Sequence, residues 1–169
     1  MSDSMKDQFA EHQRVVAAAA EQADVLARIA DRLIECFGEG GRLYLLGNGG
    51  SAADAQHIAA ELVGRFKHER RALPALALTT DTSILTAVAN DIGAEHCFSR
   101  QVEALATKRD VVWALSVSGR SPNVLRAMEA AKRIDSAVDK VIAEMKHLTP
   151  DLGGKASTTE MGDAIASAV

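Results

Sequence analysis

His57 and Glu61 are the side chains of this sequence best suited to acid–base chemistry. They are four residues apart, so on a helix their side chains are neighbours. An imidazole beside a carboxylate binds a metal ion, or leaves Glu61 as a general base held by the histidine. The alternative is a solvated ion pair, which contributes under about 1 kcal/mol on a protein surface. Asp54 and Arg65 fall within the same arc of the predicted helix.

A glycine-rich loop, Gly47-Asn48-Gly49-Gly50-Ser51, leads directly into that helix. Its glycines let the backbone turn sharply and approach a ligand, and Ser51 is placed to cap the helix. Free N–H groups at a helix N-terminus favour an anion, so the loop is a candidate phosphate site. A tight turn without a ligand is the alternative. The glycine spacing also fits a loose dinucleotide-binding pattern, but the acidic residue expected about 20 residues later is missing.

A second loop carries three serines, Ser116, Ser118 and Ser121, around a glycine and is followed by Pro122. Proline is typical of the first turn of a helix, which makes Ser121 the natural N-cap. Hydroxyl and backbone N–H groups at the positive end of a helix dipole bind a phosphate ester without a strong cation. Capping alone explains Ser121 but not the other two serines, so we predict phosphate binding here.

Helices and strands alternate along the chain, and this order positions both loops. Apolar runs predict strands over 42–46, 75–78 and 111–115, and helical spacing predicts helices over 5–37 (with a joint near 22–24), 51–66, 82–89, 94–107 and 122–133. Such an order is typical of a three-layer α/β fold with a parallel sheet covered on both faces. Ligands bind these sheets beyond the carboxyl ends of the strands, so we expect the turns at Gly49 and Ser118 to lie side by side.

Length and composition indicate a soluble, globular, intracellular domain. The 169 residues are 47% hydrophobic and 25% charged, with a formal net charge of -4. No apolar run approaches the roughly 20 residues that cross a bilayer, and the polar N-terminus is not a secretory signal. A mildly acidic chain without a basic block is a poor nucleic-acid binder, and Cys36 and Cys97 suit a reducing compartment. We therefore expect a cytoplasmic protein whose partners include neither nucleic acid nor membrane.

The two loops together resemble those of a known family. The glycine-rich loop with Asp54, His57 and Glu61, then Asn90-Asp91, then the segment 116–123 resemble, in the same order, the motifs of phosphoheptose isomerases. These enzymes belong to the sugar-isomerase (SIS) superfamily, and the likeness covers roughly residues 5–133. It implies a flavodoxin-like SIS fold and a homotetramer with sites between subunits. It also implies an isomerase that converts sedoheptulose 7-phosphate to D-glycero-D-manno-heptose 7-phosphate through an enediol, for lipopolysaccharide precursor synthesis.

Carried over by position, the resemblance gives each motif residue a role. Glu61 would be the catalytic acid/base and, with His57, would hold one zinc ion. The substrate would contact Asn48, Gly49, Gly50, Ser51, Glu61, Asn90, Asp91, Ser116, Val117, Ser118 and Ser121, with the four serines on its phosphate. The chain departs from the family at Val117, where threonine is frequent, and at Arg120, where asparagine is frequent.

The end of the chain departs further. After Arg133 the resemblance implies two more strands and a helix whose Gln and His complete the metal site. Residues 134–169 contain no Gln, and their single histidine is His147. Helical spacing over 136–148 precedes a stretch, 148–165, that resembles the C-terminal tail of isocitrate and isopropylmalate dehydrogenases. We therefore predict an SIS-type sugar-phosphate domain over 1–133, followed by an atypical helical tail over 134–169 in place of the C-terminal strands. Without those strands, 111–115 would form an unprotected sheet edge.

Three functions are consistent with these observations. The first is an isomerase, which the group of Asp54, His57 and Glu61 favours. The second is a non-catalytic SIS module that binds a sugar phosphate or scaffolds a protein complex. The third is an inactive hybrid chain. The missing C-terminal Gln and His favour the second and third functions. We rank the isomerase first because Asp54, His57 and Glu61 lie on one face of the predicted helix.

Overall fold

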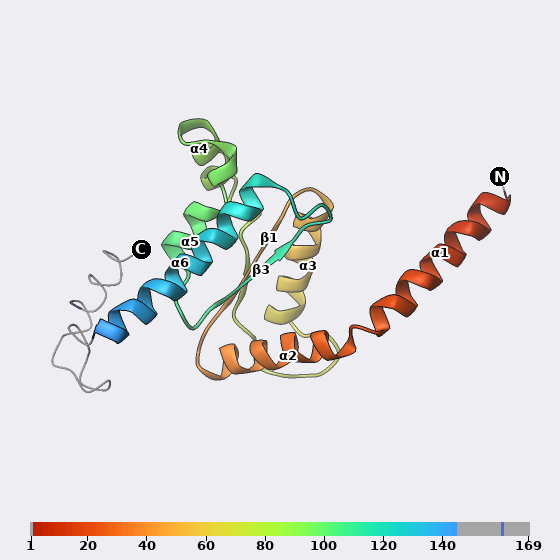
Figure 1. The fold of residues 1–169 in the computed structure, drawn as a ribbon, viewed down its shortest axis with the longest axis horizontal. Coiled ribbons are helices and arrows are strands. Elements are labelled where there is room, and N and C mark those ends of the chain that lie inside the picture. Colours follow the sequence, from red (N-terminus) through yellow and green to blue (C-terminus); the bar gives the residue numbers. More distant parts are fainter. Residues whose placement is uncertain (1, 145–159, 161–169) are drawn as a thin grey trace.

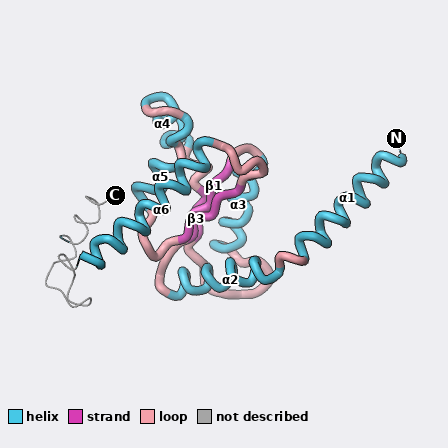
Figure 2. Tube along the Cα trace, viewed as in Figure 1, coloured by secondary structure: helices cyan, strands magenta, loops and turns pink. Residues whose placement is uncertain are grey.

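The computed structural model describes residues 2–144 and 160 of the chain. A parallel sheet of three strands forms its centre, with helices around it (Figure 2). The strands lie in the order β2-β1-β3 and span Leu43–Gly47 (β1), Ala75–Ala77 (β2) and Val111–Leu115 (β3). The parallel α/β sheet predicted from the sequence is thus confirmed.

Helices cover both faces of the sheet or extend away from it (Figure 1). They are α1 (Ser2–Ala20), α2 (Ala23–Gly38), α3 (Gly50–Val63), α4 (Thr82–Asp91), the 3₁₀ helix η1 (Ala94–His96), α5 (Ser99–Leu105) and α6 (Pro122–Glu144). The break between α1 and α2 lies at the predicted joint. α2 and α3 pack on one face of the sheet, and α5 and α6 pack on the other.

β1 is the centre of both apolar layers. Leu43 and Leu45 point to the α2–α3 face, where they pack with Ala55. Tyr44 and Leu46 point to the α5–α6 face, where they join a cluster that includes Phe98, Val102, Val124 and Ala127. Alternate side chains of a strand point to opposite faces, so a strand covered on both sides must be apolar throughout. This requirement explains the uninterrupted hydrophobic run before the glycine-rich loop.

Two helix predictions differ from the structure. The segment predicted as one helix over 94–107 is divided into η1 and α5, and Cys97 and Phe98 between them are buried in the core. The helices predicted over 122–133 and 136–148 are one helix as far as Glu144, since no Gly or Pro interrupts the sequence there. The segment 148–165, apart from Glu160, lies outside the described residues, as does His147.

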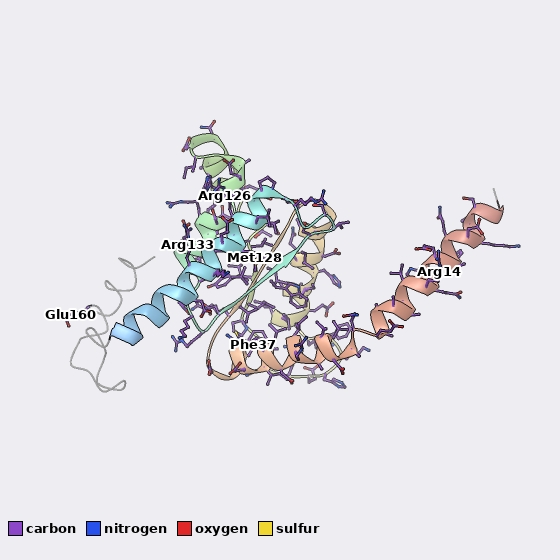
Figure 3. All side chains as sticks on the ribbon, in the orientation of Figure 1. Arg14, Phe37, Arg126, Met128, Arg133 and Glu160 are labelled. Atoms are coloured by element: carbon purple, nitrogen blue, oxygen red, sulfur yellow. The ribbon has the colours of Figure 1, made fainter. Side chains whose placement is uncertain are left out.

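α1 projects away from the rest of the molecule (Figure 1). Side chains such as Arg14 extend from it with no other element alongside (Figure 3). Its large apolar side chains are exposed: Met5, Phe9, Val15 and Val16. No helix in the described part of the chain is both long enough and apolar enough to cross a membrane. The apolar side chains of α1 therefore have no partner in the part of the chain that the structure describes.

β3 is an edge strand in the part of the chain that the structure describes, as expected. All five of its residues are half-buried, whereas all five of β1 are buried. One side of β3 pairs with β1, and no other strand among residues 2–144 pairs with its second side.

Candidate functional site

A pocket of about 220 Å³ lies between the loops that follow β1 and β3. The side-chain amides of Asn48 and Asn123 join the two loops through a reciprocal pair of hydrogen bonds. Nδ2 of Asn48 donates to Oδ1 of Asn123 at 2.9 Å, and Nδ2 of Asn123 donates to Oδ1 of Asn48 at 2.8 Å. The pocket is lined by Asn48, Ser51, Leu115, Ser116, Val117, Ser118 and Ser121. The two turns therefore lie side by side, as predicted.

Glycine is required at two positions of the loop after β1. A Cβ at Gly47 would lie 2.8 Å from the carbonyl oxygen of Leu115 and 2.8 Å from Cβ of Ser51, closer than atoms can pack. Gly49 has a φ of 55°, a conformation that side chains disfavour. The chain can thus turn from the sheet into α3 while staying close to β3.

Ser51 does not cap α3, contrary to prediction. The helix begins one residue earlier, at Gly50, and its N-cap is Gly49, which makes no side-chain hydrogen bond. Ser51 therefore lies in the first turn, where its hydroxyl lines the pocket. Ser51 thus lines the pocket between the two loops but has another place in the helix than the one predicted.

The loop after β3 is held by its own serines. Oγ of Ser116 accepts a hydrogen bond from the N–H of Gly119 at 3.1 Å. Oγ of Ser118 accepts one from the N–H of Arg120 at 3.2 Å. Both hydroxyls act here as acceptors, so each O–H remains available to donate to a ligand. Val117 between them is fully exposed.

Ser121 directly precedes Pro122, the first residue of α6, so it is the N-cap residue, as predicted. Its carbonyl oxygen accepts hydrogen bonds from the N–H groups of Val124 and Leu125, at 3.1 and 3.0 Å. Its hydroxyl makes no hydrogen bond within the described residues and lines the pocket instead. Three serines from the β3 loop and Ser51 thus surround one pocket at the N-termini of α3 and α6. Hydroxyl donors and two positive helix ends favour an anion such as a phosphate ester.

His57 and Glu61 are neighbours on the outer face of α3, as predicted. Nε2 of His57 lies 3.7 Å from Oε1 of Glu61, and the two side chains are 76% and 36% exposed. Asp54 and Arg65 are exposed on the same side, and Arg65 pairs with Glu69. This polar face is open to solvent in one copy of the chain.

The acid–base pair is separate from the pocket. Glu61 follows Ser51 by ten residues of α3, or about 15 Å at 1.5 Å per residue. Neither His57 nor Glu61 lines the pocket. A ligand that contacts both places must be elongated, with its anionic group at one end.

The pair supplies only part of a metal site. Zinc is commonly held by three or four protein ligands, and His57 with Glu61 provides two. Among the described residues, no group of three His, Cys, Asp or Glu side chains could hold a metal ion. The donor types fit zinc, but their number requires further ligands from elsewhere.

Asn90 and Asp91 lie at the end of α4, outside the residues that line the pocket. Nδ2 of Asn90 donates to Oδ1 of Asp91 at 2.7 Å, and both residues are exposed. The structure therefore does not bring this predicted pair to the pocket. Asn123, in contrast, had no predicted role. The only sequence feature that pointed to a role for it was its side-chain amide next to the serine-rich loop.

A family model, the sequences of known proteins and solved structures all point to the same family. The SIS domain family matches residues 8–143. Phosphoheptose isomerase 1 of Campylobacter jejuni is 50% identical over 135 residues, which are 80% of this chain and 73% of the relative. Phosphoheptose isomerase of Geotalea uraniireducens is 55% identical over 135 residues, 79% of this chain and 71% of the relative.

Two solved structures share the fold. The phosphoheptose isomerase of Neisseria gonorrhoeae has a TM-score of 0.63 and 41% identity, over 78% of this chain and 71% of that chain. The phosphoheptose isomerase of Francisella tularensis has a TM-score of 0.70 and 34% identity, with the same coverage.

Proposed function

The chain belongs to the SIS domain family and, within it, to the phosphoheptose isomerases; from this membership we propose that it interconverts sedoheptulose 7-phosphate and D-glycero-D-manno-heptose 7-phosphate. This reaction would supply a heptose precursor of lipopolysaccharide. The observation that carries the proposal is the pocket between the two loops, with its four serines and two helix N-termini.

The pocket would bind the phosphate of the sugar. Ser51, Ser116, Ser118 and Ser121 would donate hydrogen bonds to the phosphate oxygens, with the backbone at Val117 beside them. Asn48, Gly49, Gly50, Asn90 and Asp91 would contact the sugar. Binding energy from the phosphate is remote from the reacting carbons, so it holds the substrate while the chemistry occurs elsewhere.

Glu61 would be the acid/base group. Moving the carbonyl from C2 to C1 requires a base that takes a proton from C1 and returns one to C2, through an enediol. C1 and C2 lie at the opposite end of the heptose from its phosphate, which agrees with the separation between Glu61 and Ser51 along α3. His57, 3.7 Å from the carboxylate, would orient it.

A homo-oligomer would complete the site. α1 exposes Phe9 and Val16 to solvent, and an apolar stripe of this kind on a helix favours packing against another copy. We infer a homotetramer in which a neighbouring subunit covers the face of α3. We also place the enzyme in the cytoplasm, where Cys36 and Cys97, both free thiols, would remain reduced.

The test is a coupled assay of ketose-to-aldose conversion with Glu61→Gln. We expect turnover to fall by about 10²- to 10⁴-fold, the usual contribution of a general base, while sugar-phosphate affinity is retained. Glu129→Gln, which changes an exposed carboxylate on α6 in the same way, should leave turnover unchanged. Equal turnover in wild type and Glu61→Gln would contradict the role. Phosphate-ester binding without turnover in the wild type would instead favour a non-catalytic binding module.

We further propose one zinc ion per site, with His57 and Glu61 as two of its ligands. When bound, zinc supplies a Lewis acid. Metal analysis of the purified protein should find about one zinc per chain in the wild type and in the control His68→Ala, and much less in His57→Ala, because zinc sites depend on each imidazole ligand. Equal zinc contents in all three proteins would show that His57 is not a ligand.

A further inference from the structure

The last turn of α3 is held by an arginine from outside the helix. The guanidinium of Arg70 donates through Nη2 to the carbonyl oxygen of Glu61 at 2.7 Å, and through Nη1 to that of Leu62 at 2.8 Å. Nη1 also donates to the carbonyl oxygen of Arg71 at 3.0 Å, within the segment 64–74 that leads from α3 to β2. One side chain thus connects this segment to the helix turn that contains Glu61.

These contacts lie where a helix lacks donors of its own. The last four carbonyl groups of a helix have no intrahelical partner. In α3 the N–H of Gly64 donates to the carbonyl oxygen of Ala60 at 2.8 Å, but no backbone N–H of the described residues donates to that of Glu61. Gly64 has φ and ψ of -78° and -117°, so it does not form the left-handed turn that commonly ends a helix. Arg70 supplies the donor for Glu61 instead.

The charge of Arg70 also suits this position. The C-terminus of a helix is the negative end of the helix dipole, which a nearby cation stabilises. The last turn of α3 contains no basic residue of its own. Arg65, just after the helix, pairs with Glu69. Arg70 therefore stabilises the end of α3 by hydrogen bonds and by charge together.

The turn that Arg70 holds carries the acid/base group. Glu61 is two residues from the end of α3 at Val63, and helix ends fray. The direction of a helical side chain is set by its backbone, so fraying would turn Glu61 away from His57, whose Nε2 lies 3.7 Å from the carboxylate. By holding the carbonyl group of Glu61 itself, Arg70 fixes the direction in which the carboxylate points.

We propose that Arg70 is a positioning residue for Glu61: its guanidinium holds the last turn of α3 so that the carboxylate stays in place for proton transfer. This role of Arg70 rests on the acid/base function proposed above for Glu61. Arg70 does not line the pocket between the loops. Its loss should therefore slow proton transfer without weakening the binding of the phosphate.

Arg71 provides a matched control. Its Nη2 donates to the carbonyl oxygen of Phe37 at 3.3 Å, next to the end of α2 at Gly38. Arg71 thus makes the same kind of contact with a different helix. Arg71→Ala removes the same charge and the same atoms as Arg70→Ala. It leaves the contacts of Arg70 in place, because Arg70 bonds only to the backbone of Arg71.

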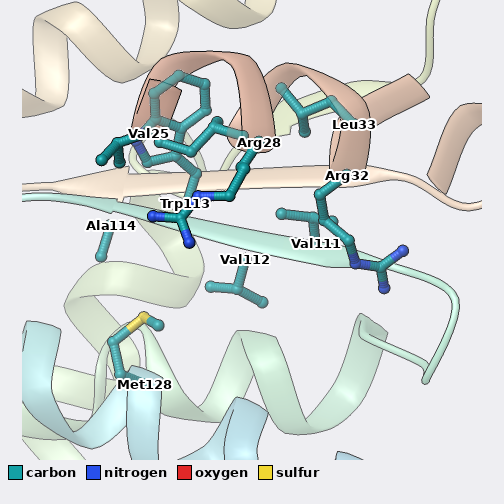
Figure 4. Close-up of a pocket in the computed structure, with 10 residues that line it drawn as sticks. Val25, Arg28, Arg32, Leu33, Val111, Val112, Trp113, Ala114 and Met128 are labelled. Carbon is teal, nitrogen blue, oxygen red and sulfur yellow. The ribbon is translucent and has the colours of Figure 1, made fainter. Parts of the chain in front are cut away.

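Trp113 reports whether each variant is folded. It is the single tryptophan of the chain and lines a groove between α2, β3 and α6 (Figure 4). No residue of the segment 64–74 lines that groove, so the substitutions do not alter the surroundings of the tryptophan directly. Its emission during urea denaturation measures the stability of each variant, and activities are compared at a temperature where all of them are folded.

Steady-state kinetics with sedoheptulose 7-phosphate tests the role in catalysis. We expect Arg70→Ala to lower kcat about 10- to 100-fold, because a small misplacement of a catalytic group is costly, and to change KM less than about threefold. Arg70→Lys keeps the charge but loses the planar fork of donors, so it should recover part of the loss. Arg71→Ala should keep the kcat of the wild type.

A double variant tests whether Arg70 acts through Glu61. In the Glu61→Gln background, Arg70→Ala should lower turnover no further, since the group that it positions is already gone. A purely structural role would give the same fold-loss in both backgrounds. That result would overturn the proposal, as would wild-type kcat in Arg70→Ala or an equal loss of kcat in Arg71→Ala.

Hydrogen exchange tests the contact without any turnover. The backbone amides of residues 60–63 should exchange at least about twofold faster in Arg70→Ala than in the wild type, and Arg71→Ala should match the wild type. Unchanged exchange in Arg70→Ala would overturn the hold of Arg70 on α3. Faster exchange combined with equal turnover of the wild type and Glu61→Gln would instead overturn the function proposed for Glu61, and the hold of Arg70 on the helix would stand.

Discussion

The serine hydroxyls that line the pocket between the two loops differ in their hydrogen-bond partners. Ser116 and Ser118 accept hydrogen bonds from backbone N–H groups of their own loop, so their positions are fixed before any ligand binds. The hydroxyl of Ser121 has no partner in the described part of the chain, so a ligand is its natural acceptor. Because Ser116 and Ser118 are already fixed in place, less conformational entropy is lost when they bind a ligand.

The double variant Ser118→Ala, Ser121→Ala tests the phosphate assignment. Hydrogen bonds to charged groups are worth about 1.5–3 kcal/mol each, so we expect the Kd for a sugar phosphate to rise about tenfold or more per hydroxyl. Isothermal titration with sedoheptulose 7-phosphate is the measurement. Ser83→Ala on α4, away from the pocket, is the matched control. Unchanged affinity in the double variant would remove this loop from phosphate recognition.

At the scale of elements, the site depends on two strand–loop–helix units placed side by side by the parallel sheet. β1 leads into α3 and β3 leads into α6, and both turns emerge at the same edge. The amides of Asn48 and Asn123 connect the units directly. The connection fixes the spacing of the serines on either side of the pocket.

A double-mutant cycle with Asn48→Ala and Asn123→Ala tests this connection. Two neutral hydrogen bonds contribute about 0.5–1.5 kcal/mol each when buried and less when exposed, so we expect a coupling of about 1 kcal/mol in the free energy of unfolding. Urea denaturation of the four proteins measures it. Strictly additive losses would show that the two loops do not support each other through these amides.

Local patterns were sufficient to predict the strands, the order of helices, both loops and the acid–base face of α3. These features depend on residues close together in sequence. The pair of Asn48 and Asn123 could not be predicted, because the residues are 75 positions apart and only the folded sheet brings them together. The capping role predicted for Ser51 was wrong, because a helix start can shift by one residue: α3 begins at Gly50, and its N-cap is Gly49.

At the scale of the whole molecule, α1 and the polar face of α3 are exposed surfaces that the described residues of one copy do not cover. Phe9 and Val16 lie on one side of α1, and Arg14 and Ala18 lie on the opposite side. If α1 packs against other copies, we expect the side with Phe9 and Val16 to make the contact.

Phe9→Glu with Val16→Glu should therefore dissociate the oligomer and reduce isomerase activity, because carboxylates cannot be buried in an apolar interface without large cost. Light scattering after size exclusion measures the mass, and circular dichroism checks that the sheet domain remains folded. Arg14→Glu with Ala18→Glu introduces the same two carboxylates on the opposite side and should leave the mass unchanged. If both double variants dissociate the oligomer equally, the contact is not specific to the apolar side of α1.

The distance in sequence between the two halves of the pocket also bears on synthesis of the chain. Asn48 leaves the ribosome long before Asn123, and β2, the strand between them in the sequence, lies on the other side of β1 and cannot complete the site. Contacts this remote form slowly, and nascent chains emerge at about 5–20 residues per second. The growing polypeptide therefore carries the glycine-rich loop for several seconds before β3 and the second loop are made to complete the pocket.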